Sequence, residues 1–237
     1  MIFRRRHKDN GSGDPSSPPD ATGAGDEVAA EVDVMSLGDE VTGEEFRSLV
    51  GPWDVSERPI DASDPRSIDL GALVVKGRVG FELRLQTDKD TDAVQAVMLV
   101  AQDGAVELRA FAKSRGVGLW DGVRKEIAAD AARRGGTATE LDGRYGTELR
   151  VVAPIRTPEG KAATQTSRIV GVDGPRWLLR ATYLGRPATD PDPTYVLEAA
   201  VRDLIVVRGQ EAMPPREQIP LRLPPSARRA PPPAGTR

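Results

Sequence analysis

Residues 81–86 read Phe-Glu-Leu-Arg-Leu-Gln and alternate strictly between apolar and polar side chains. Successive side chains of a β-strand point to opposite faces, so this stretch predicts a strand with one apolar and one charged face. Its Glu-Leu-Arg centre recurs at Glu107–Arg109 and at Glu148–Arg150, again within alternating runs. Each copy is expected to bury its leucine and to present a carboxylate beside a guanidinium. The repeats therefore predict an antiparallel sheet with one apolar and one charged face.

Two other segments have the period of a helix. Leu119, Val123, Ile127 and Ala131 fall four apart and stop at Gly135-Gly136, which predicts a helix over residues 120–134. A second helix is expected to open at Asp192-Pro193, with aspartate as the cap and proline at the first helical position. The expected fold is α+β: an antiparallel sheet with two amphipathic helices packed on one face, flanked by disordered tails.

The two ends of the chain differ in composition from its middle. Residues 9–69 hold sixteen acidic and three basic residues, and residues 210–237 hold eight prolines and five arginines. Neither end has enough apolar residues to offset the entropy of ordering the chain. Composition therefore predicts a disordered tail over 1–50, basic at its tip and then acidic, a single α+β domain over 51–209, and a Pro-rich extended arm over 210–237.

Several classes of protein are excluded by composition. The chain has no cysteine and a single histidine, His7, so it offers no disulfide and no thiolate nucleophile or metal ligand. No stretch approaches the roughly 20 apolar residues of a membrane span, and the basic start at Met1–Lys8 has no apolar stretch behind it. We expect a cytoplasmic protein without a transmembrane segment.

No combination of residues predicts catalysis or a cofactor. A nucleophile paired with a base would need histidine, cysteine or an activated lysine, and the middle of the chain has no histidine or cysteine. Asp88, Asp90 and Asp92 have a spacing similar to a calcium loop, but the glycine and glutamate that complete such a loop are absent. We interpret them as an acidic hairpin loop. An enzyme is therefore the least favoured class, and neither catalytic residues nor a metal site are predicted.

One loop has some features of an anion site. Lys113, Arg115, Gly116 and Gly118 precede the helix expected at Trp120, and helix N-termini attract anions. The complete nucleotide-binding patterns are missing, because no Gly-Lys-Ser/Thr follows. The alternative interpretation is a flexible loop that leads into a helix.

Arginines on the sheet suggest a second candidate surface. Arg84, Arg109, Arg150 and Arg180 could line one face and contact the phosphates of a nucleic acid. Three of them follow a glutamate two residues earlier, so the face is nearly neutral. Cross-strand pairing, worth about 0.2–1 kcal/mol per pair, explains the pattern as well.

The stretch Gly171-Val172-Asp173-Gly174-Pro175-Arg176-Trp177 resembles an uncharacterised family of actinobacterial proteins that is defined only as a domain of unknown function. Other stretches match in the same order: Gly51-Pro52-Trp53-Asp54, Asp69-Leu70-Gly71, Phe111-Ala112, Gly118-Leu119-Trp120-Asp121, Gly135-Gly136, Gly146-Thr147-Glu148-Leu149-Arg150, Val206-Val207-Arg208-Gly209 and Pro214-Pro215-Arg216-Glu217. The resemblance implies a cytoplasmic actinobacterial protein and assigns no activity. It also implies that the Pro-rich arm up to about Pro224 belongs to the domain.

Two functions remain from the sequence. The first is a non-enzymatic protein-binding or scaffold domain that meets an unidentified protein partner through its tails or loops. The alternative is a nucleic-acid or nucleotide-associated module that uses the Arg-bearing sheet face.

Overall fold

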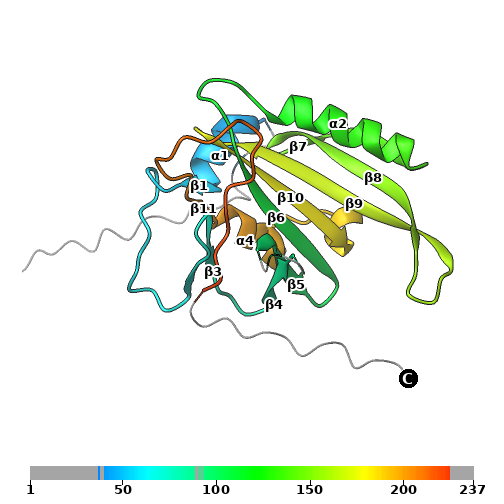
Figure 1. Ribbon diagram of the computed structural model, residues 1–237, viewed down its shortest axis with the longest axis horizontal. Helices are drawn as coiled ribbons and strands as arrows, with labels where there is room; N and C mark the ends of the chain where they lie inside the picture. The colour runs from blue at the N-terminus through cyan, green and yellow to red at the C-terminus, as the bar shows by residue number, and fades with distance from the viewer. Residues whose placement is uncertain (1–36, 38–39, 89–90, 92, 225–237) are drawn as a thin grey trace, which may run out of the picture. The chain divides into compact units, whose positions relative to one another are not determined.

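The computed structural model describes residues 37, 40–88, 91 and 93–224 (Figure 1). In this part of the chain the larger sheet has seven strands: β4 (Phe81–Thr87), β5 (Val94–Ala101), β6 (Gly104–Ala112), β7 (Thr137–Gly143), β8 (Gly146–Arg156), β9 (Ala162–Asp173) and β10 (Trp177–Gly185). The smaller sheet has four: β1 (Trp53–Asp54), β2 (Ser67–Asp69), β3 (Leu73–Lys76) and β11 (Ile205–Val206). The helices are α1 (Gly43–Val50), α2 (Trp120–Arg133), α3 (Arg186–Thr189) and α4 (Val196–Arg202).

The larger sheet is antiparallel throughout and has the strand order β4-β5-β6-β10-β9-β8-β7. The strands β4 to β6 form one antiparallel meander, α2 follows in the chain, and β7 to β10 form a second meander. The last strand of the second meander, β10, then pairs with β6 from Trp177↔Ala112 to Gly185↔Gly104. This pairing makes β10 an inner strand whose two faces are both covered for much of its length.

The α+β class is confirmed, but the two long amphipathic segments do not share one face of the sheet. Leu179 and Ala181 of β10 belong to the core that contains α4, whereas Leu178 belongs to the core that contains α2. Ile169 and Val170 of β9 divide in the same way, and in Figure 1 the helices lie on opposite sides of the strands. Neighbouring apolar residues in these strands supply an apolar patch on each face, so each helix covers its own patch.

The three Glu-Leu-Arg copies differ in which face receives the leucine. Leu83 and Leu108 pack in the core on the α4 side, as the alternation predicts. Leu149 is also fully buried, but it packs against α2 on the other side, opposite Ile169. The third copy is therefore inverted relative to the first two, and it turns Glu148 and Arg150 towards the side of α4.

The second predicted helix starts later and is shorter than expected. Asp192 accepts hydrogen bonds from the backbone N–H and the hydroxyl of Thr194, which forms a turn instead of a helix cap. The helix α4 begins only at Val196, and Ile205 at the end of the apolar stripe lies in β11. The strands β2 and β3 are separated by Gly71, which adopts a positive φ of 81°.

The predicted boundary at residue 51 is too late. Residues 43–50 form α1, in which Phe46 and Val50 are buried, so the N-terminal segment contributes to the core. The ring of Phe46 packs edge-to-face on Tyr145 with centroids 5.1 Å apart. Residues 1–36, the rest of the predicted tail, lie outside the described residues.

The first part of the Pro-rich arm packs on the sheet beside the end of β6. The strand β5 pairs with β6 only along Ala105–Leu108, and the arm bonds to the next part of β6. Ala110 accepts from Ile219, while Ala112 donates to Glu217 and accepts from Arg216. The arm thereby satisfies backbone groups that would otherwise lack partners, and it buries Ile219 and Leu221. Residues 225–237 lie outside the described part.

We predict that Ile219→Ala lowers the free energy of unfolding by about 2–5 kcal/mol, because Ile219 is 4% exposed and its loss leaves a cavity under the arm. Leu223→Ala in the same arm is the matched control, because Leu223 is 53% exposed and its substitution should cost less than about 0.5 kcal/mol. Denaturant unfolding of both variants measures the difference. Equal stability of the two variants would show that the arm does not belong to the folded core.

Candidate functional site

The loop predicted as an anion site lies next to a carboxylate of the protein itself. The backbone N–H groups of Leu119 and Trp120, at the start of α2, donate to the carboxylate of Asp173 at 3.1–3.2 Å. The Nζ atom of Lys113 lies 3.2 Å from the same carboxylate. Asp173 therefore holds the position at the helix N-terminus that an external anion would take.

Three of the four predicted anion-binding residues, Lys113, Gly116 and Gly118, line a cavity of about 410 Å³. Arg115 is exposed and is not part of its lining. The other walls come from α1 and from residues 171–175 of the Gly-Val-Asp-Gly-Pro stretch. Arg47 of α1 also lines it, but Arg47 is bound by both oxygens of Glu57 at 2.8 and 2.9 Å. Both buried cations of this cavity are thus neutralised by carboxylates of the chain.

The Gly-Val-Asp-Gly-Pro-Arg-Trp stretch has a structural explanation. A Cβ atom on Gly171 would lie 2.0 Å from the ring of Trp120, and one on Gly174 would lie 2.2 Å from the ring of Trp177. Each glycine therefore allows a tryptophan ring to pack directly on the backbone. Trp120 donates its indole N–H to the carbonyl of Thr147 at 2.6 Å. With Asp173 capping α2, this stretch joins the sheet to the start of that helix.

The four sheet arginines do not share one face. Arg84, Arg109 and Arg180 lie on the same side of the sheet. The cross-strand pairs that show this are Arg180↔Arg109, Glu107↔Met98 and Met98↔Arg84. Arg150 is paired with Arg168 and lies on the other side, because the third Glu-Leu-Arg copy is inverted.

Each arginine of the shared face has a glutamate nearby. Arg84 bonds Glu82 at 2.7 Å, and Arg109 bonds Glu107 at 2.8 Å. Arg180 lies 3.9 Å from Glu107 and 5.4 Å from the centre of the Phe111 ring. The sequence predicted cross-strand pairing, but in the first two copies the bonded glutamate and arginine lie in the same strand, and Arg109 lies directly opposite Arg180. The nearby glutamates leave this face nearly neutral.

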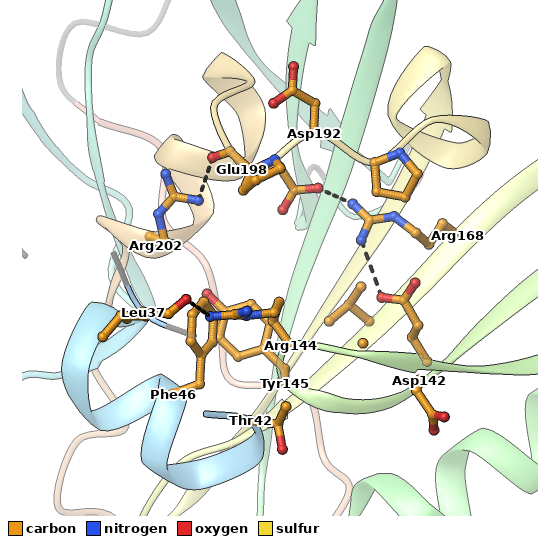
Figure 2. Close-up of a pocket in the computed structure, with 15 residues that line it drawn as sticks. Leu37, Thr42, Phe46, Asp142, Arg144, Tyr145, Arg168, Asp192, Glu198 and Arg202 are labelled. Carbon is orange, nitrogen blue, oxygen red and sulfur yellow. Dashed lines mark hydrogen bonds and ion pairs between the residues drawn. The ribbon is translucent and has the colours of Figure 1, made fainter. Parts of the chain in front are cut away.

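A larger cavity, of about 500 Å³, lies between α1, the β7–β8 turn, β9 and α4 (Figure 2). Phe46 lines it from α1, Arg144 and Tyr145 from the β7–β8 turn, and Glu198 and Arg202 from α4. The guanidinium of Arg144 lies over the ring of Phe46, 4.6 Å from its centre. A cavity of this volume is in the range of small-molecule and side-chain pockets.

Arg168 is the centre of the polar groups in this cavity, and its side chain is only 7% exposed. It donates from Nη1 to Glu148 at 3.2 Å, from Nη2 to Glu198, and from Nε to the carbonyl of Pro187 at 3.0 Å. The hydroxyl of Tyr183 donates to the other oxygen of Glu198 at 2.9 Å, and the guanidinium lies 4.2 Å from the Tyr183 ring. The cluster ties together β8, β9, β10 and α4.

Arg168 is shared by two carboxylates in this cluster, and Arg150 also attracts the carboxylate of Glu148. Burial raises the pKa of Glu148, and the opposing attraction of Arg168 does not cancel this effect. The Oε2 atom of Glu148 is bonded to Arg168, whereas Oε1 has no hydrogen-bond partner among the described residues. The wall of the cavity therefore carries an acceptor that is available to a donor from outside.

Neither Arg168 nor Glu198 belongs to a motif of the sequence. Arg168 could have been noticed as a charged residue followed directly by the apolar run Ile169–Val172 in a strand. Glu198 lies on the apolar helix α4 beside Leu197, and it gives no comparable signal. Its role depends on where α4 meets β9, which is a tertiary contact.

Within the described residues, no group of three or more histidine, cysteine, aspartate or glutamate side chains could hold a metal ion. Asp88 accepts hydrogen bonds from Thr91, as in a hairpin loop, while Asp90 and Asp92 fall outside the described part. Among the helices described, none is both long and apolar enough to cross a membrane.

A family model described as "Protein of unknown function (DUF3710)" matches residues 51–230. The chain belongs to this family. No curated protein matches the chain. The DUF3710 match includes the Asp173 loop, the Arg168 cluster and the packed part of the arm, and it confirms the resemblance to a domain of unknown function. The family description names no activity.

We predict that Asp173→Ala in this DUF3710 domain lowers the free energy of unfolding by about 0.5–2 kcal/mol, because α2 loses its cap. Sulfate should then restore part of the loss, since it can take the vacated position beside Lys113. Thermal unfolding with and without sulfate measures the effect, with the exposed Asp142→Ala as control. Sulfate that stabilises wild type and Asp173→Ala equally would contradict Asp173 as the resident anion.

A second prediction concerns the dependence of stability on pH. Because the folded-state pKa of Glu148 is raised, the folded protein binds the proton more tightly than the unfolded chain. The contribution of Glu148 to stability is therefore full below the ordinary glutamate pKa of about 4.3 and declines as pH rises above it. Glu148→Gln should remove this decline. The test is the difference in unfolding free energy between wild type and variant from acid to neutral pH, and a constant difference would refute the prediction.

Proposed function

We propose that this protein is a non-enzymatic binding domain, and that the cavity in Figure 2 receives a cationic side chain, lysine or arginine, of a protein partner. The observation that carries the proposal is the carboxylate of Glu148. It lines the cavity, and one of its oxygens lacks a partner among the described residues.

Charge supports a cation at this position. The guanidinium of Arg168 is shared by Glu148 and Glu198, so an added cation would balance the second carboxylate. A cation beside Glu148 would also counter the burial that raises the pKa of its carboxyl. A neutral or anionic group would gain neither effect.

Aromatic rings in the cavity support the same chemistry. Phe46 and Tyr145 form an edge-to-face pair, and the chain's own Arg144 already lies over the face of Phe46. Guanidinium and ammonium groups bind aromatic faces with about 0.5–2 kcal/mol. Because Arg144 already covers the face of Phe46, this contact shows that a guanidinium fits in the cavity, and the carboxylate of Glu148 is the group that would bind an added cation.

A protein partner is favoured over a nucleic acid because of the pairing on the sheet face. Each arginine on the face shared by Arg84, Arg109 and Arg180 lies near a glutamate, whereas a phosphate-binding surface needs a net positive charge. Residues 1–36 and 225–237, which could also meet a partner, lie outside the described residues. The cavity is therefore the basis of the proposal.

The same proposal includes the cellular compartment and the group of organisms in which the protein acts. The absence of cysteine and of a long apolar stretch, together with the resemblance of the Gly171–Trp177 stretch, supports a protein of the actinobacterial cytoplasm. A partner would then be met in that compartment.

The test uses N-acetyl-lysine amide and N-acetyl-arginine amide as probes, with N-acetyl-norleucine amide as the uncharged control. We expect the two cationic probes to shift the backbone amide resonances of Gly143 and Tyr145 at ~10 mM, above the ~1 mM dissociation constant that about 4 kcal/mol of binding gives. Glu148→Gln should weaken binding at least about fivefold, since it removes roughly 1 kcal/mol of charge attraction. Glu159→Gln, at an exposed turn, should not change it.

Two results would contradict this function. One is that the cationic probes and the uncharged probe shift the same resonances equally. The other is that Glu148→Gln binds the cationic probes as well as wild type does while its spectrum shows an intact fold.

A further inference from the structure

The strand β4 forms one edge of the seven-stranded sheet, and β5 is its single strand partner in the described part of the chain. No other backbone hydrogen bond involves residues 81–87 within that part. An edge strand presents unpaired N–H and C=O groups along its outer side, which can pair with the edge of another chain. In natural proteins, charges, bulges or covering segments usually prevent an edge strand from pairing with another chain. The side chains of β4 therefore decide what can pair with it.

The sequence of β4 is complementary to itself when it runs antiparallel. Residues directly opposite each other in an antiparallel pair lie on the same face. With Leu83 opposite Leu83 of a second copy, each Glu82 lies opposite the Arg84 of the other copy. Phe81 then lies opposite Leu85 in the same way. Charges meet charges on one face, and apolar side chains meet apolar side chains on the other.

Other symmetric registers are unfavourable. A two-fold axis that continues the sheet allows only shifts that keep each residue on its face, and therefore steps of two residues. A shift in one direction places Arg84 opposite Arg84, and a shift in the other places Glu82 opposite Glu82. Like charges directly opposite are destabilising. Only the register centred on Leu83 pairs opposite charges twice.

The exposure of the side chains agrees with this arrangement. The side chains of Glu82 and Arg84 are 65% and 61% exposed, and in the single chain they bond each other. Phe81, Leu83 and Leu85 are only partly buried against the core, so their outer sides remain uncovered. Val79, just before the strand, is fully exposed. The β-bulge at Gln86/Thr87 ends the regular stretch, which leaves residues 81–85 for pairing.

We propose that two copies of this chain associate through β4, antiparallel and centred on Leu83, so that the larger sheets join into one. The interface is isologous, so it closes as a dimer and does not propagate into a filament. Each copy contributes one Glu82 and one Arg84 to two reciprocal ion pairs. This inference is independent of the cavity proposal, because β4 contributes no residue to that cavity.

The experiment is charge reversal in the full-length chain, followed by sedimentation equilibrium. Wild type is expected to dimerise. Glu82→Arg and Arg84→Glu should each raise the dissociation constant of the dimer about tenfold or more, because both ion pairs become like-charge pairs. Both residues are exposed, so the single variants should keep the circular dichroism spectrum of the wild type.

Two combinations separate this register from a general effect of charge. The double variant Glu82→Arg/Arg84→Glu is again self-complementary and should dimerise like wild type. An equimolar mixture of the two single variants should form a heterodimer, although each alone is monomeric. A monomeric wild type, a dimer that survives both single reversals, or a double variant that stays monomeric would each overturn the proposal.

Discussion

The hydrogen bond from the indole N–H of Trp177 to the carboxylate of Asp54 connects the two sheets, and the rest of the structure depends on it. Its length is 2.8 Å, and both residues are buried although 123 positions separate them in the chain. Trp177 begins the inner strand β10, and Asp54 ends β1 of the smaller sheet. Burial alone would raise the pKa of Asp54, but hydrogen bonds from Ser56 and Trp177 hold it below its usual range. An ionised acceptor inside the protein makes this a strong bond that fixes the relative position of the sheets.

On the other side of the larger sheet, the glycines and the aspartate of residues 171–175 fix the position of α2. Trp120 packs on Gly171, and Asp173 caps α2 while it holds Lys113. The stretch that carries the family resemblance is thus accounted for by close backbone contacts and a helix cap. The loop before Trp120 has the charges of an anion site, but its anion comes from within the chain. The cation and the helix terminus are both satisfied, and so their attraction for a ligand is small.

The inversion of the third Glu-Leu-Arg copy places Glu148 on the wall of the larger cavity. In the first two copies the charged side chains lie on a partly exposed face and pair within their own strand. In the third copy Leu149 packs under α2, and Glu148 is turned to the side where Arg168 and Glu198 lie. One tripeptide therefore gives two ion pairs within their own strands and one buried cluster in which Glu148 and Glu198 share Arg168. The difference lies in the neighbouring strands and not in the tripeptide.

The sequence by itself determined the three Glu-Leu-Arg strands, the helix over 120–133 and the α+β class, because alternation and helical period act over a few residues. It also contained the apolar pairs Leu178-Leu179 and Ile169-Val170, which are consistent with a sheet covered on both faces. The tertiary structure alone decided that α2 and α4 lie on opposite faces, that α1 joins the core, and that Glu148 meets Arg168 rather than Arg150. These outcomes follow from cross-strand register and from contacts between residues far apart in the chain, and a change of register by one residue moves every side chain to the other face.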